Sequence, residues 1–307
     1  MAHFRFAVQS GRAPTMAAWR DLARQVEDLG YSCLCIPDHF GDQFAPLLAL
    51  TVAAEATTKL KVGTLVLDND YRHPVVLAKE VATLELAAEG RLEFGLGAGW
   101  MTTDYEEAGI PLDPAGVRVD RMVEGLHVMR EMWATGTCTF AGKHYTLNDA
   151  KCEPQPSAVP PIVIGGGSKR ILSIAGREAD IVGVNPDLRT GHIGAEVTAG
   201  VVPEKWDERV GWVRAAAGDR FASIELQILT FANMIVPNRK ETLEQFAPMF
   251  GMPAEVLGEI PIAMVGTVEE ICEQLVARRE RWGFSYVVLH EGEMEAFAPV
   301  VARLAGT

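Results

Sequence analysis

Two adjacent side chains, Asp38 and His39, are the first candidates for proton chemistry in this sequence. They follow an apolar run that ends at Pro37, where a strand would end. An imidazole titrates near neutrality and can relay a proton, and a neighbouring carboxylate can orient the ring or raise its basicity. A structural interpretation fits the pattern equally well, with His39 as a hydrogen-bonded group and Asp38 as the cap of the next helix. Both interpretations stay open at this point.

The segment 160–175 is a candidate anion site. It contains an apolar strand, the three glycines Gly165, Gly166 and Gly167, and a helix that opens at Ser168. Glycines let successive backbone N–H groups converge on one point, and the free N–H groups of a helix N-terminus favour negative charge. An ordinary strand-to-helix turn requires only one glycine. Three glycines followed by a serine therefore favour a phosphate ligand over an ordinary turn.

A further glycine-rich segment runs from Gly95 to Trp100 at the end of another apolar run. It does not meet the dinucleotide-binding fingerprint, because the third glycine would fall on Trp100 and no clear helix begins there. We interpret it as backbone without side chains, which lets a flat molecule approach closely, with the Trp100 ring on one side of that molecule. The sequence contains no Walker lysine pattern, nucleophile elbow or zinc-type histidine pair, so a bound cofactor must supply the chemistry.

Asp68, Asp70 and His73 form a polar stretch between two apolar segments. Carboxylates and imidazoles of this kind can bind a metal, but nothing in their spacing fixes a ligand geometry. We therefore expect a solvated loop here and no metal site.

Eight apolar strand candidates, each followed by a helical pattern, must position these residues. The strands are expected at 4–9, 32–37, 60–67, 91–96, 162–164, 180–184, 224–231 and 285–289. Apolar runs without alternation are buried on both faces, which indicates a parallel sheet. Eight strand and helix repeats in 307 residues favour an α/β fold of the closed (β/α)8 TIM barrel type over an open doubly wound sheet. Functional residues are then expected at the carboxyl ends of the strands.

We expect a single barrel domain over residues 1–307, with insertions. The segment 137–147, in which Gly142 separates two β-like runs, predicts a hairpin. The polar segment 185–203 is long enough for a lid or active-site loop. The segment 240–266 carries two further helices and, together with 185–203, is expected to shape a substrate pocket.

The charge balance argues against nucleic acid and membranes as partners and favours a small-molecule substrate. The 28 basic and 41 acidic residues give a net charge of −13, which opposes binding to polyanions. The N-terminus lacks signal-peptide features, and no stretch approaches the roughly 18 apolar residues of a membrane helix, so we expect a cytoplasmic enzyme. The five cysteines are odd in number and lack paired CxxC spacing, which predicts reduced thiols.

Five motifs follow one another along the chain: Asp38-His39-Phe40 and the segments 62–66, 95–100, 164–167 and 179–183. In this order they resemble the bacterial-luciferase-like flavin and deazaflavin superfamily, and look most like its coenzyme F420-dependent branch. The resemblance covers nearly the whole chain. It implies a luciferase-like (β/α)8 barrel with insertions, a homodimer, and an isoalloxazine or deazaflavin ring in the barrel mouth.

The resemblance also implies roles for individual residues. The turn 165–168 would bind the cofactor phosphate, and a non-proline cis peptide between Leu65 and Val66 would bulge the third strand against the ring. His39 would be the proton partner, supported by Asp38. The implied cofactor-binding residues are Thr64, Leu65, Val66, Gly97, Ala98, Gly99, Trp100, Gly165, Gly166, Gly167 and Ser168.

Two positions depart from the alcohol- and sugar-phosphate-oxidising members that the chain resembles. Trp100 stands where they carry a glutamate, and Gln43 where they carry a tryptophan, so oxidation of those substrates is not inferred. The leading hypothesis is an F420-dependent oxidoreductase that transfers a hydride between the deazaflavin and an unidentified small organic substrate. The second is a two-component monooxygenase that uses reduced FMN from a separate reductase. The third is a barrel that binds a flavin-like ligand without turnover.

Overall fold

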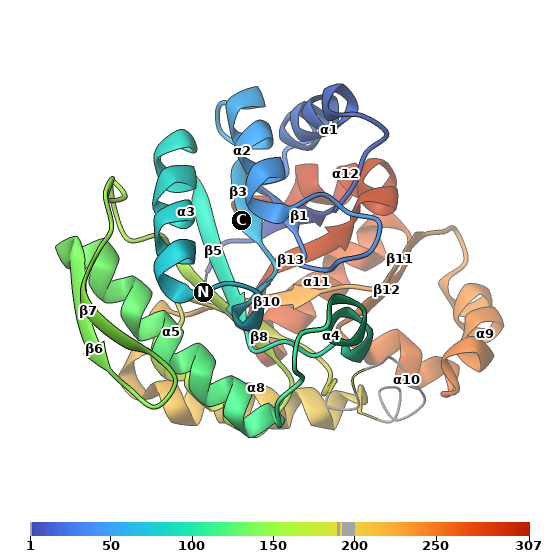
Figure 1. The fold of residues 1–307 in the computed structure, drawn as a ribbon. Helices are drawn as coiled ribbons and strands as arrows, with labels where there is room; N and C mark the ends of the chain where they lie inside the picture. Colours follow the sequence, from blue (N-terminus) through green and yellow to red (C-terminus); the bar gives the residue numbers. More distant parts are fainter. Residues whose placement is uncertain (1, 189–190, 192–199) are drawn as a thin grey trace.

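The chain forms a closed barrel of eight parallel strands (Figure 1). The computed structural model describes residues 2–188, 191 and 200–307. The barrel closes through pairing of β13 with β1 and of β3 with β5, so the predicted (β/α)8 barrel is confirmed over the open sheet. In order around the barrel, the strands are β1 (Arg5–Gln9), β2 (Cys33–Ile36), β3 (Lys61–Thr64), β5 (Leu92–Gly97), β8 (Ile162–Gly166), β9 (Ile181–Val184), β10 (Glu225–Leu229) and β13 (Phe284–His290). The short strand β4 (Leu67–Asp68) continues β3 along β5.

Helices cover the outside of this barrel (Figure 1). They are α1 (Met16–Asp28), α2 (Pro46–Ala56), α3 (Pro74–Ala87), α5 (Ala115–Thr135), α6 (Lys169–Glu178), α8 (Pro203–Ala217), α11 (Val268–Trp282) and α12 (Met294–Leu304). Every residue of β2 and β5 is buried, because one face packs against helices and the other faces the barrel interior. Trp19, Trp133 and Trp206 fill the layer between strands and helices. Among the described residues, no helix combines the length and apolar character needed to cross a membrane.

A separate apolar cluster fills the barrel interior, and its members are Ala7, Cys33, Cys35, Val163, Ile181, Tyr286 and Val288. Leu65, Val66 and Leu229 pack against this cluster from the carboxyl ends of their strands. The Sγ atoms of Cys33 and Cys35 lie 3.5 Å apart, and all five cysteines are free thiols. The residues after β3 therefore pack against buried side chains of the barrel interior, which fixes their position at the carboxyl end of the barrel.

The opposite end of the barrel is closed by paired charges. Arg5 and Lys61, the first residues of β1 and β3, contact the carboxylate of Glu93 at 2.6 and 3.0 Å. Arg5 also binds Glu225, the first residue of β10, through two hydrogen bonds of 2.7 and 2.5 Å. The hydroxyl of Tyr286 donates to Glu93 at 3.0 Å. Arg5 and Lys61 thus compensate the charge of Glu93, whose side chain is only 2% exposed.

The predicted hairpin is confirmed as β6 (Thr137–Ala141) and β7 (Thr146–Lys151), an antiparallel pair. The region 240–266 contains the two expected helices, α9 (Arg239–Phe250) and α10 (Ala254–Glu259). It also contains a strand that the sequence did not predict, β12 (Ala263–Gly266), which pairs in parallel with β11 (Ala232–Ile235). Strands of four residues depend on their pairing partner, so local pattern is a poor guide to them. Most of the predicted loop 185–203 lies outside the described residues.

Candidate active site

The carboxyl ends of β2, β3 and β5 bring the predicted proton and ring-binding residues to one end of the barrel. The Leu65–Val66 peptide is cis, as the resemblance implied. The hydroxyl of Thr64 donates to the carbonyl oxygen of Gly95 at 2.8 Å and accepts from its N–H at 2.7 Å, which ties β3 to β5. The predicted strand 60–67 is thus interrupted after Thr64 and resumes only at β4.

The glycines at the end of β5 are explained by neighbouring protein atoms. A Cβ at Gly97 would lie 2.7 Å from Cγ2 of Val66. Gly99 has a φ of +70°, and a Cβ there would overlap the Tyr105 hydroxyl and Oδ2 of Asp68. The bulge after β3 and a buried tyrosine therefore occupy the spaces that a Cβ would fill at these two glycines. A contact between the segment and a cofactor ring stays a prediction.

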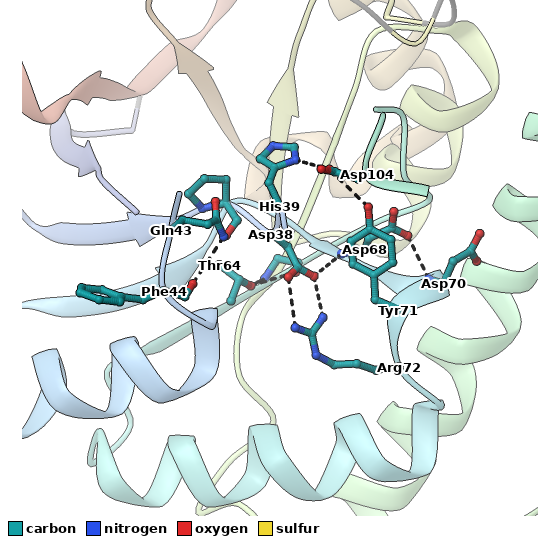
Figure 2. A network of polar contacts seen from close by, with 12 residues as sticks. Asp38, His39, Gln43, Phe44, Thr64, Asp68, Asp70, Tyr71, Arg72 and Asp104 are labelled. Atoms are coloured by element: carbon teal, nitrogen blue, oxygen red, sulfur yellow. Dashed lines mark hydrogen bonds and ion pairs between the residues drawn. The ribbon is translucent and has the colours of Figure 1, made fainter. Parts of the chain in front are cut away.

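His39 is held by a residue that the sequence analysis did not single out. Its Nδ1 atom lies 2.6 Å from Oδ2 of Asp104 (Figure 2). Asp104 belongs to α4 (Thr102–Ala108), a helix of seven residues that follows Trp100. The expectation that no clear helix begins near Trp100 is wrong, because so short a helix leaves no apolar period to recognise. The Trp100 ring stands edge-on to the imidazole, with 6.1 Å between the ring centroids.

Asp38 does not support His39, contrary to the expectation from the sequence. Its carboxylate accepts hydrogen bonds of 2.6 and 3.1 Å from Arg72 and one of 3.0 Å from the backbone N–H of Asp68 (Figure 2). Successive side chains of an extended segment point to opposite sides, so neighbours in sequence receive different partners. Asp38 therefore anchors the segment after β4, whereas His39 contacts α4.

The segment 68–73 is folded into the protein and is not the solvated loop that we expected. Asp68 and Asn69 are only 6% and 1% exposed. Residues Asn69–Tyr71 form the short 3-10 helix η1, and the side chain of Asp68 accepts a hydrogen bond at its start. Within the described part of the chain, no three His, Cys, Asp or Glu side chains are arranged to hold a metal ion.

Two further carboxylates continue the buried network. Oδ2 of Asp68 accepts a 2.7 Å hydrogen bond from the hydroxyl of Tyr105. Asp70 accepts two hydrogen bonds from Arg121, both 2.8 Å. Burial, together with the nearby carboxylates of Asp70 and Asp38, raises the pKa of Asp68 to about 6. Asp68 therefore titrates close to neutrality inside the folded protein.

The three glycines 165–167 do not form one continuous turn, contrary to the expectation from the sequence. Two of its glycines, including Gly166, belong to strand β8, and only Gly167 lies between the strand and the helix. A Cβ at Gly166 would overlap Ile171, and one at Gly167 would overlap the backbone of Pro186. Close packing therefore explains two of the glycines without any ligand.

The N-terminus of α6 still offers donors that suit an anion. Ser168 occupies the N-cap position, but its side chain makes no capping hydrogen bond. The first turn contains Lys169 and no acidic residue. The buried guanidinium of Arg209, on α8, donates to the carbonyl oxygen of Gly167 at 3.3 Å. Free N–H groups, a hydroxyl and positive charges form a donor set that fits a phosphate.

The fold and the site together define an α/β barrel enzyme whose functional groups lie at the carboxyl ends of the strands. The sequence profile of the luciferase-like monooxygenase family matches residues 1–201. The chain belongs to this family.

Individual relatives differ in their reactions. The chain is 30% identical over 172 residues to an F420-dependent glucose-6-phosphate dehydrogenase of Amycolatopsis mediterranei, a match that covers 52% of each chain. It is 32% identical over 119 residues to the pyrimidine monooxygenase RutA of Allorhizobium ampelinum, which covers 38% of this chain and 32% of that protein. These matches thus span about half or less of the relatives' length.

A solved structure extends the likeness to the whole fold. The coenzyme F420-dependent tetrahydromethanopterin reductase of Methanopyrus kandleri superposes with a TM-score of 0.78 over 99% of this chain and 100% of that one. The two sequences are 19% identical, so this similarity concerns the fold alone.

Proposed function

We propose that this protein is a coenzyme F420-dependent oxidoreductase that transfers a hydride between the deazaflavin and a small organic substrate. The position of His39 carries the proposal. It follows β2, whose last residue, Ile36, pairs with Thr64 immediately before the cis Leu65–Val66 peptide. The imidazole thus follows, three residues later, the strand end that borders the bulge assigned to the cofactor ring by the resemblance. The F420-dependent relatives support this choice of cofactor.

The residues present fit such a cofactor, as judged by the uncapped α6 terminus and its donors. When bound, F420 supplies the ring carbon that accepts or releases the hydride. In the proposal, the turn at Ser168 binds the phosphate and His39 takes up or returns the accompanying proton. Trp100 shields the site from water, which strengthens the polar interactions inside it. The residues proposed to line the ring are Thr64, Leu65, Val66, Gly97, Ala98 and Gly99.

A parallel binding titration tests the cofactor. Purified protein is titrated with F420 and with FMN, each oxidised and reduced, and binding is followed by fluorescence or calorimetry. Selective F420 binding supports the proposal and permits a substrate screen with F420 absorbance as the signal. Binding of neither cofactor would overturn it, because the proposed anion site would then hold no cofactor phosphate.

A second candidate is a two-component monooxygenase that receives reduced FMN from a separate reductase. The match to the luciferase-like monooxygenase family and the relative RutA favour it. The FMN phosphate would use the same N-terminus of α6. Preference for reduced FMN in the titration, with oxygen-dependent substrate turnover, would establish this function instead.

His39→Ala separates an enzyme from a barrel that only binds a flavin-like ligand. If His39 carries the proton, turnover should fall at least about 100-fold while cofactor affinity stays nearly unchanged. His127→Ala is a suitable control, because the His127 side chain is 62% exposed on α5 and lies outside the site. Loss of cofactor binding with His39→Ala would contradict the proposed proton role and assign His39 to the structure of the site.

We also propose that the protein is a homodimer. Leu48 on α2 and Val76 on α3 are 73% and 53% exposed, although both helices are predominantly apolar. A contact between two copies of the chain at these helices would remove both aliphatic side chains from water. Light scattering should give twice the chain mass, and Leu48→Glu combined with Val76→Glu should halve it. A monomeric wild-type protein would refute this proposal.

A further inference from the structure

We propose that Asp104 is a positioning residue that fixes the imidazole of His39 in one tautomer, with hydrogen on Nδ1 and the lone pair of Nε2 free for a proton. The inference rests on the proposed function for its catalytic meaning. The arrangement itself follows from the contacts of the two side chains.

The hydrogen-bond geometry assigns the tautomer. Nδ1 of His39 lies 2.6 Å from Oδ2 of Asp104, whose side chain is 7% exposed. The same carboxylate accepts longer contacts from the hydroxyl of Tyr71 at 3.4 Å and the backbone N–H of Phe40 at 3.5 Å. An ionised carboxylate only accepts hydrogen bonds, so Nδ1 must donate to it. Nε2 then carries the lone pair in the neutral ring.

Nε2 is available for chemistry. The His39 side chain is 27% exposed, and no described residue forms a hydrogen bond with its Nε2 atom. The edge-on ring of Trp100 borders it on one side. A second polar partner on Nε2 would have indicated a purely structural histidine.

Asp104 differs from the nearby carboxylates in the partner that its side chain contacts. Each of the other buried carboxylates has its own partner: Asp38 binds Arg72, Asp68 accepts from Tyr105, and Asp70 binds Arg121. Tyr71 faces Asp104 from η1 as a neutral hydroxyl.

Among the described residues, Asp104 makes no ion pair with a lysine or arginine, and His39 is the group that can compensate its charge.

This arrangement defines the proton's path. A proton released by the substrate bonds to Nε2 through its lone pair, while the Nδ1 hydrogen stays on the hydrogen bond to Asp104. In the reverse direction, the imidazolium returns the proton from Nε2. The carboxylate holds and stabilises the ring but does not touch the reacting atoms.

Nuclear magnetic resonance detects the tautomer of His39 directly in the protein without cofactor. Protein labelled with 15N-histidine gives long-range 1H–15N spectra, in which the seven histidines show separate ring patterns. His39→Gln identifies the signals of His39. The wild type should show hydrogen on Nδ1, and Asp104→Asn should shift the ring towards hydrogen on Nε2. Glu106→Gln, an exposed carboxylate on the same helix, should leave the pattern unchanged. A neutral ring with hydrogen on Nε2 and none on Nδ1 in the wild type would overturn the inference even if the variant fails to fold.

Kinetics give the second measurement. With the loaded enzyme, Asp104→Asn should lower kcat about 100-fold or more, while KM and cofactor affinity change little. Unchanged kcat, or an unchanged tautomer in a folded variant, would refute the positioning role. A tautomer shift without any F420 binding would instead leave the Asp104 assignment standing and refute the proposed function, so the two failures are distinguishable.

Discussion

Asp68→Asn is expected to change how the stability of this protein depends on pH. Burial, together with the nearby carboxylates of Asp70 and Asp38, raises the pKa of Asp68 to about 6 in the folded protein, from an ordinary value of 3.8. Below about pH 3 the group is mostly protonated in both the folded and the unfolded chain, so it contributes little to stability. Above about pH 6 it is ionised in both states, and the folded protein then bears a cost of about 3 kcal/mol.

The wild type should therefore lose about 2–2.5 kcal/mol of unfolding free energy through this one group as the pH rises from about 4 to 7. An asparagine has no such titration. It also suits the site, because its amide can donate to the Tyr105 hydroxyl, which still has Oδ2 of Asp70 at 3.2 Å as an acceptor. The variant should gain stability relative to the wild type towards neutral pH.

The assay is urea denaturation followed by tryptophan fluorescence, at several values between about pH 4 and pH 8, where the carboxyl changes its charge. The measured quantity is the difference in unfolding free energy between variant and wild type. Asp21→Asn, at a carboxylate whose side chain is 73% exposed, is the control and should show a flat difference. A difference for Asp68→Asn that stays flat, or falls, with rising pH would refute the assignment of a raised pKa to this group.

Two more predictions concern packing and charge. Glu93→Gln leaves Arg5 and Lys61 without their shared carboxylate, so it should destabilise the barrel by about 3–5 kcal/mol in thermal or urea unfolding, and a loss below 1 kcal/mol would contradict the buried pairing. Gly99→Ala should be much more destabilising than Gly109→Ala. Both glycines have similar positive φ, but only at Gly99 would the new Cβ overlap other atoms, so equal losses in urea unfolding would contradict the packing argument.

The barrel was predictable because its signals are local. Continuous apolar runs such as Cys33–Ile36 and Ile181–Val184 are what strands buried on both faces require, and their alternation with helical patterns specifies a parallel sheet. The motif series also predicted the cis Leu65–Val66 peptide. Short elements carried no such signal: α4 has seven residues and β12 has four, and both depend on tertiary contacts.

The sequence by itself determined the fold class, the strand ends at which functional groups gather, and His39 as a candidate for proton transfer. Only the tertiary structure decided the partners. Asp104, 65 residues from His39, holds the imidazole, whereas the adjacent Asp38 binds Arg72. The reason is physical: residue type and spacing report which groups can ionise, but a hydrogen bond depends on the direction in which each side chain leaves the backbone and on the helix that packs opposite it.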